Sequence, residues 1–220
     1  MKQYVLFSVL LFISTVNGSA QSAFPTGGYR NIDELRKKQP SMSCDFHPVA
    51  RIKEEILYNG GNDYFMRCEE ENADQKMITT ALYAVSIGST LFLNTLVHQL
   101  ATGYANVISE GRYMLFYSGF KDKKKKRTLS IGIAAGRSQV ELSIPSTTRA
   151  VLANAKPPKR FLLAIDLQTG LLTLCDRIFL IQVLKPFPDI EYQYALEPEQ
   201  NSEQTLINYM QMVNKASGTN

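Results

Sequence analysis

The hydrophobic positions between residues 77 and 119 fall into short runs of β-strand type. Four short runs rich in β-branched and aromatic residues are separated there by turn residues, and such residues suit the half-buried surface of a β-strand. The connections are too short for crossover helices, with the exception of residues 95–103, so the pattern predicts an antiparallel meander. The four predicted strands are Met77–Val85, Thr90–Asn94, Tyr104–Ile108 and Arg112–Ser118.

The last of these runs is apolar on both of its faces. Tyr113, Leu115 and Tyr117 point to one side of a strand, and Met114 and Phe116 point to the other. A strand with two apolar faces is typically covered on both sides. This run is therefore predicted to be a central strand, with Tyr113, Leu115 and Phe116 largely buried.

Strand patterns also occur on either side of the meander, and a helix is predicted near the N-terminus. Asn31 is a suitable N-cap for this helix, Glu34 three residues later completes a capping box, and Ile32 and Leu35 face the core. An Asn-Gly turn joins two of the flanking strands. The flanking strands are predicted at residues 46–56, 64–70 and 138–144, with a hairpin at 161–174.

The C-terminal part of the chain has helical periodicity. Two helices are predicted at Arg177–Leu184 and Asp189–Leu196, with prolines between them. A last helix is predicted to begin with Asn201 as its cap. Its apolar face consists of Leu206, Ile207, Met210 and Val213.

Together these elements predict one α+β domain over residues 21–220, in which an antiparallel sheet carries a short N-terminal helix and two or three C-terminal helices. The pattern leaves open whether the sheet is barrel-like. Residues 1–20 are predicted to be a signal peptide, because Lys2 precedes an apolar stretch at 4–16 and small residues end at Ala20. Cleavage there leaves Gln21 as the new N-terminus, and no later stretch is apolar enough to span a membrane.

Positive charge is concentrated in one run. The formal net charge of the whole chain is only +4, which does not indicate a nucleic-acid partner. Two interpretations of the run remain: a solvated hairpin tip whose lysines keep strand edges from pairing with other chains, or contact with an anionic envelope surface. The basic residues are Lys121, Lys123, Lys124, Lys125, Lys126 and Arg127.

The histidines and cysteines give no recognisable catalytic motif. His47 and His98 lack the context of a nucleophile elbow or of a papain-like site, so they are interpreted as surface or hydrogen-bonded core residues. The three cysteines form no CxxC or zinc pattern. An oxidising compartment permits a disulfide between Cys44 and Cys68, and the alternative is that all three thiols are reduced and buried.

The other candidate features are interpreted as structural rather than as catalytic or binding sites. Adjacent acids in Glu69–Glu71 would point to opposite faces of a strand, and no calcium-loop spacing is present, so no metal ligand is assigned. Gly132–Gly136 lacks the Lys and the hydroxyl of a phosphate loop, and no cofactor is expected. Asp166 and Glu141 suit a glycosidase only if the fold holds them about 5–10 Å apart. Four tyrosines offer a sugar platform as the alternative to core rings, namely Tyr83, Tyr104, Tyr113 and Tyr117.

Three groups of motifs resemble a single family. They are GGYRNIDELRKKQPS near the mature start, then LFLNT, GYANV and GRYMLFYSG in the meander, and finally AIDLQTGLLTL followed by IFLIQVLKPFPDIEYQY and a last helix ending near Asn214. The chain is thereby similar to an uncharacterised family of small secreted proteins from Gram-negative gut anaerobes, a domain of unknown function. The resemblance implies secretion and the predicted fold, and it implies no activity.

These observations favour an exported, non-enzymatic protein that binds a partner in the periplasm or at the outer membrane. The partner is an envelope protein or an anionic surface, and no catalytic, cofactor or metal residue is assigned. The alternative is a cell-envelope hydrolase whose acidic catalytic residues are assembled only by the fold. A deep pocket that holds two ionisable groups in hydrogen-bond contact would favour the hydrolase.

Overall fold

An open antiparallel sheet is the centre of the computed structural model, which describes residues 24–52, 56, 62–70, 74–119 and 160–218. A hairpin of β2 (Phe46–Ala50) and β3 (Tyr64–Cys68) branches from the main path and joins β6. The sheet does not close into a barrel. Its main path follows, in order, β1 (Gly27–Tyr29), β4 (Ala84–Ile87), β5 (Thr90–Asn94), β6 (Tyr104–Ser109), β7 (Tyr113–Ser118), β8 (Phe161–Asp166) and β9 (Leu172–Leu174).

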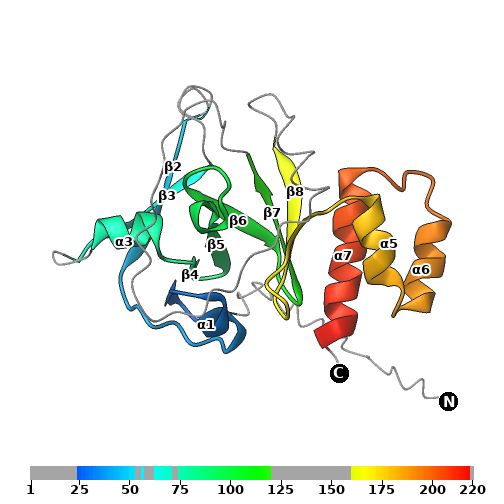
Figure 1. Ribbon diagram of the computed structural model, residues 1–220, viewed down its shortest axis with the longest axis horizontal. Helices are drawn as coiled ribbons and strands as arrows, with labels where there is room; N and C mark the ends of the chain where they lie inside the picture. Colours follow the sequence, from blue (N-terminus) through cyan, green and yellow to red (C-terminus); the bar gives the residue numbers. More distant parts are fainter. Residues whose placement is uncertain (1–23, 53–55, 57–61, 71–73, 120–159, 219–220) are drawn as a thin grey trace, which may run out of the picture.

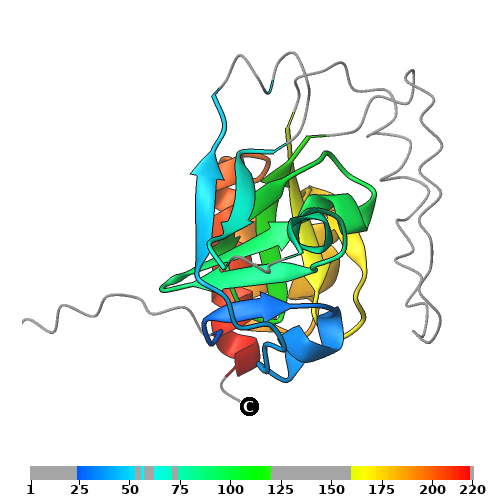
Figure 2. The ribbon, with the colours of Figure 1, turned by 90° about the vertical axis from the view of Figure 1, so that its left-hand side faces the viewer.

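Helices lie on both faces of this sheet. The three C-terminal helices form one layer beside β7 and β8, and α1 lies near β4 on the other side (Figure 1). Seen from the side, the C-terminal layer stands behind the strands (Figure 2). The helices are α1 (Ile32–Arg36), α3 (Gln75–Thr80), the 3-10 helix η1 (Thr95–His98), α5 (Arg177–Leu184), α6 (Pro188–Ala195) and α7 (Glu203–Gly218).

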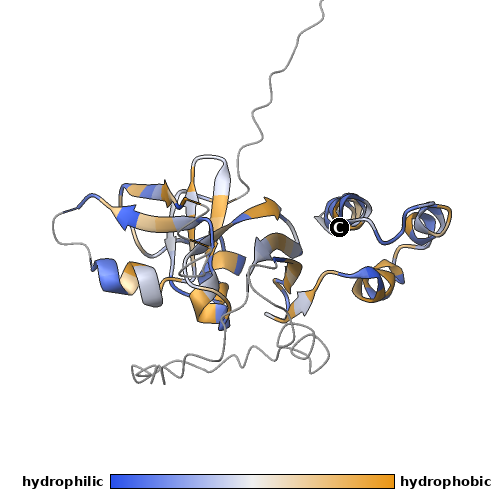
Figure 3. Ribbon diagram, turned by 90° about the horizontal axis from the view of Figure 1, so that it is seen from above, coloured by the Kyte–Doolittle hydropathy of each residue, from blue (hydrophilic) through white to orange (hydrophobic). Residues whose placement is uncertain are grey.

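Strand β7 is buried between these two layers, which confirms its predicted central place. Leu115 packs in the cluster formed with α5, α6 and α7, whereas Met114 and Phe116 pack in the cluster that includes α1 and β4. Tyr113, Leu115 and Phe116 are each no more than 8% exposed. Full burial of a large apolar side chain contributes about 1.5–3 kcal/mol. Apolar residues, orange in Figure 3, recur along the strands and the helices that cover them.

The predicted N-terminal helix is confirmed together with its capping box. The side chain of Asn31 accepts a hydrogen bond from the backbone N–H of Glu34 at 2.9 Å. The Glu34 carboxylate accepts in turn from the backbone N–H of Arg30 at 2.7 Å, one residue earlier than the cap itself. Ile32 and Leu35 are buried as expected. The bond to the Glu34 N–H satisfies a backbone donor that the first helical turn leaves free, and the bond from the Arg30 N–H holds the residue before the cap.

The predicted strand Met77–Val85 is wrong in its first half. Helix α3 occupies that part, and β4 begins only at Ala84. The Asp74 side chain accepts from the backbone N–H of Met77 at 3.0 Å and caps the helix. Ile78 and Leu82, four residues apart, are both fully buried. Leu82 lies just beyond the end of α3, so the cap and the burial of Ile78 on the helix outweigh the β-branched composition of the segment.

Two smaller differences concern element ends. Ser202, not Asn201, caps the last helix, since its hydroxyl oxygen accepts from the backbone N–H of Thr205 at 3.1 Å. Strand β2 ends at Ala50, earlier than the predicted 46–56. The predicted strand at 138–144 lies outside the described residues. None of the described helices has both the length and the apolar character required to cross a membrane.

Candidate functional site

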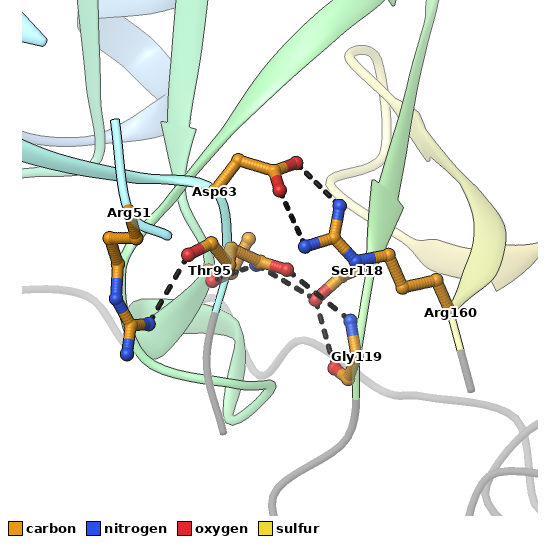
Figure 4. Close-up of polar contacts among 7 residues, drawn as sticks. Arg51, Asp63, Thr95, Ser118, Gly119 and Arg160 are labelled. Carbon is orange, nitrogen blue, oxygen red and sulfur yellow. Dashed lines mark hydrogen bonds and ion pairs between the residues drawn. The ribbon is translucent and has the colours of Figure 1, made fainter. Parts of the chain in front are cut away.

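A buried polar network lies where β7 ends and β8 begins, and Asn62 is at its centre. Asn62 is fully buried. Its side-chain nitrogen donates to the hydroxyl oxygens of Thr95, at 2.6 Å, and Ser118, at 3.0 Å. Its side-chain oxygen accepts from the backbone N–H of Gly119 at 3.3 Å. One amide therefore joins three segments of the chain (Figure 4).

Thr95 extends this network into the connection between η1 and β6. Its hydroxyl oxygen lies 2.5 Å from the carbonyl oxygen of Ala101 and 2.9 Å from that of Gly103. Gly103 has a φ of +104°, and a Cβ there would lie 2.8 Å from the backbone oxygen of Tyr64. This φ and this close approach require glycine. The network is thus a structural junction, and the Thr95 hydroxyl is hydrogen-bonded within it.

Two arginines border the junction and are also engaged. The guanidinium of Arg160 forms a bidentate ion pair with Asp63, with both N–O distances at 2.5 Å. Arg51 donates to the carbonyl oxygen of Asn62 at 3.2 Å, and its guanidinium lies 4.5 Å from the ring centroid of Phe65. Bidentate pairs of this kind fix geometry as well as charge. The junction therefore holds the start of β8 against the segment that leads into β3 (Figure 4).

His98 is a core residue and its ring is not hydrogen-bonded. Its side chain is buried, its ring centroid lies 4.9 Å from that of Tyr83 in an edge-to-face contact, and neither ring nitrogen has a hydrogen-bond partner. Burial disfavours the charged imidazolium and lowers the pKa of His98 to about 4. His98 is therefore neutral near pH 7.

None of the three cysteines is in a state that favours reaction as a nucleophile. Cys44 and Cys68 are joined by a disulfide with a Cα–Cα distance of 6.0 Å. Cys175 is buried under the C-terminal helices, and burial raises the pKa of its thiol to about 12. A nucleophilic cysteine acts as the thiolate, which this environment disfavours.

His47 is the more exposed histidine and lies between two carboxylates. Its Nε2 atom is 3.3 Å from an Asp45 carboxylate oxygen and 3.6 Å from a Glu69 carboxylate oxygen. Asp45 precedes β2 and Glu69 follows β3, so the antiparallel pairing of these strands brings the three side chains together. The sequence interpretation treated His47 and the Glu69–Glu71 run separately and missed this cluster.

Of the two acids considered as a glycosidase pair, only Asp166 lies in the described residues. Asp166 accepts a hydrogen bond from the backbone N–H of Gln168 at 2.8 Å and lies 3.5 Å from Arg112. These contacts stabilise the turn between β8 and β9. Glu141 lies outside the described residues, as do the basic run 121–127 and Gly132–Gly136.

The four tyrosines considered as a sugar platform are distributed between core and surface. Tyr83, Tyr104 and Tyr113 are buried, and the hydroxyl of Tyr104 donates to the carbonyl oxygen of Ile78 at 2.5 Å. Tyr117 is partly exposed, with its hydroxyl 3.0 Å from a Glu203 carboxylate oxygen. Three of these rings therefore serve as core residues.

Comparison with known proteins places the chain in a family. No curated protein and no solved structure matches it. A family model matches residues 27–217, which include every strand that the structure describes and nearly all of the last helix. The chain therefore belongs to a family of unknown function, DUF6563.

Proposed function

We propose that the chain is an exported, non-enzymatic protein that binds an anionic surface in the periplasm or at the outer membrane through its basic run, residues 121–127. The supporting observation is the way in which the ends of segment 120–159 are held. Ser118 and Phe161 are paired neighbours on β7 and β8. Asn62 binds the backbone of Gly119, and Asp63 binds Arg160. The segment with the basic run thus starts where β7 ends and returns where β8 begins, at neighbouring strand ends that these contacts hold together.

The state of the reactive side chains supports binding over catalysis. The chain has two histidines and three cysteines. Cys44 and Cys68 are cross-linked, Cys175 has a raised thiol pKa, and His98 is buried and neutral. His47, the remaining histidine, is half-exposed, and its Nε2 atom faces the carboxylates of Asp45 and Glu69. A hydrolase that used a Cys–His or Ser–His pair would require one of these groups to be accessible beside its partner.

The electrostatic part of the proposal is tested by co-sedimentation with vesicles. Parent protein is expected to bind phosphatidylglycerol vesicles at low salt, to release them at high salt, and not to bind phosphatidylcholine vesicles. Each basic residue near an anionic surface contributes about 1 kcal/mol, so replacing Lys123–Lys126 by Ser should weaken binding by at least about tenfold.

A variant with the same loss of charge elsewhere is the matched control. It carries Ser at four exposed basic positions in the described residues, namely Arg30, Lys37, Lys76 and Lys185. This variant should bind nearly as well as the parent. The proposal is wrong if the parent does not bind, if salt has no effect, or if both variants lose binding equally.

Export is tested separately by the mass of the mature protein. Protein recovered from the periplasm or medium should begin at Gln21, because small residues suitable for a signal peptidase end at Ala20. A mass that retains residues 1–18, or material confined to the cytoplasm, would contradict export without bearing on vesicle binding.

A further inference from the structure

The exposed end of the β2–β3 hairpin gathers three metal-ligating side chains. Asp45, His47 and Glu69 each offer one ligand atom, and these three atoms all lie within 4.8 Å of one another. Asp45 and His47 are two residues apart along one strand, so their side chains share a face. The backbone N–H of Glu69 donates to the carbonyl oxygen of Asp45 at 3.3 Å, which places Glu69 directly across from Asp45.

The two distances from His47 Nε2 to the carboxylates match a zinc coordination sphere. Zinc binds imidazole nitrogen at about 2.0–2.1 Å and carboxylate oxygen at about 2.0–2.2 Å, so two tetrahedral ligands lie about 3.3–3.6 Å apart. His47 Nε2 is 3.3 Å from the Asp45 oxygen and 3.6 Å from the Glu69 oxygen. These two distances fit a single bound ion, and the Asp45 and Glu69 oxygens lie within 4.8 Å of each other, so rotation of the two exposed carboxylates can bring both to the same ion.

The orientation of the imidazole is a second, separate observation. Although the His47 side chain is 46% exposed, its Nε2 atom is shielded from solvent and makes no hydrogen bond to either carboxylate or to any other group. A ring nitrogen that faces two carboxylates and donates a hydrogen bond to neither has the position expected of a metal ligand. Neutral imidazole binds a metal through this lone pair.

The disulfide joins the residues that directly precede the two carboxylates of the cluster in sequence. Cys44 precedes Asp45 and Cys68 precedes Glu69, so the covalent bond joins the two strands one residue from each carboxylate. It fixes the relative position of the two ligand-bearing backbones before any ion binds. Holding ligands in place in this way lowers the entropy lost on binding.

We infer that Asp45, His47 and Glu69 form a binding site for a divalent transition-metal ion, with Zn²⁺ the best match. Three protein ligands leave the fourth tetrahedral position to water or to a group from a partner. Arg67, which pairs with His47 across the hairpin, is exposed and its long side chain can turn toward solvent. The inference rests on Asp45, His47 and Glu69 alone and does not depend on the proposed function.

Isothermal titration with Zn²⁺ tests this site. Oxidised protein without a histidine tag is required, because tag residues and free thiols of Cys44 and Cys68 would themselves bind zinc. Parent protein is expected to bind one ion per chain with saturation, and the melting temperature should rise with Zn²⁺ concentration. His47→Gln and Glu69→Gln should each weaken binding by at least about tenfold.

Glu199→Gln is the matched control, since Glu199 is exposed and lies near the start of α7, and its replacement changes the charge as Glu69→Gln does. This variant should keep the parent affinity. Circular dichroism checks that each variant remains folded. The inference is overturned if the parent shows no saturable binding, which would leave His47 as an ion-pair partner of the two acids, or if His47→Gln binds as tightly as the parent.

Discussion

The side chain of Asn214, in the last helix, binds both backbone polar groups of Tyr113 at the start of β7. Its oxygen accepts from the Tyr113 N–H at 2.8 Å, and its nitrogen donates to the Tyr113 carbonyl oxygen at 2.7 Å. The same nitrogen lies 3.1 Å from the Ser109 hydroxyl oxygen. One buried amide thus acts as a strand partner and attaches α7 to the centre of the sheet.

Replacing Asn214 by Ala should therefore destabilise the protein more than an ordinary loss of one hydrogen bond. Each buried backbone group left without a partner costs about 1–3 kcal/mol, so we expect a loss of about 2–5 kcal/mol in the free energy of unfolding. Urea unfolding followed by circular dichroism measures it. Asn208→Ala, at a more exposed position of the same helix, is the control and should change stability by less than about 1 kcal/mol. Equal losses in the two variants would contradict the role of Asn214.

The turn before β7 requires a glycine, because Gly111 lies directly against the Asn214 side chain. Gly111 has a φ of +145°, and a Cβ there would lie 2.6 Å from the Asn214 side chain. We expect Gly111→Ala to lower the free energy of unfolding by about 3 kcal/mol or more, because strain in the turn adds to the displacement of Asn214. Gly88→Ala is the comparison, since Gly88 also has positive φ, at +57°, but no atom within 4 Å of the added Cβ. If the two substitutions cost the same, steric contact with Asn214 contributes nothing.

Local patterns in the sequence predict much of this fold. Strands such as β5 and β7 and helix α5 agree with their predicted bounds to within a residue, because alternation and helical period depend on neighbours a few positions apart. The strand predicted at Met77–Val85 shows the limit, since a capping side chain and two core contacts decide between helix and strand there. Local composition alone does not show whether the capping bond and the core contacts form.

The polar sites could not be predicted in this way. Asn62 binds Thr95 and Ser118 over sequence separations of 33 and 56 residues, and Asp63 pairs with Arg160 over 97. No period links such positions, so only the strand order brings them together. The cluster of His47 with Asp45 and Glu69 likewise requires the register of β2 with β3. The Asn-Gly turn and the pair Cys44 and Cys68 indicated that these segments are neighbours, but neither fixed the register.

The disulfide should make a measurable contribution to stability. It closes a loop with a sequence separation of 24 residues, and a loop of this size corresponds to about 3 kcal/mol in the chain-entropy account. We expect the double variant Cys44→Ser, Cys68→Ser to unfold at a correspondingly lower urea concentration, measured with a metal chelator present. Parent protein treated with reductant should show a similar loss. A midpoint that reductant does not change would contradict a structural disulfide.

Burial of His98 predicts a loss of stability in mild acid. Its pKa falls from 6.5 in the unfolded chain to about 4 in the folded protein, so between these values the unfolded chain binds a proton that the folded protein does not. The contribution is fully present above pH 6.5 and is lost progressively as the pH falls through about 4, by up to about 3 kcal/mol. This loss is measured as the change in the urea midpoint between pH 7.5 and pH 5. Few carboxyl groups titrate in that range.

The variant that tests this assignment is His98→Leu, which removes the titrating ring from the core. Its stability should depend less on pH between 7.5 and 5 than that of the parent, even if its absolute stability differs because the contact with Tyr83 is changed. His47→Gln serves as the comparison, because it removes the other, half-exposed imidazole of the chain and leaves His98 in place. If the slope persists in His98→Leu and disappears in His47→Gln, the buried histidine is not the group that makes the fold sensitive to acid.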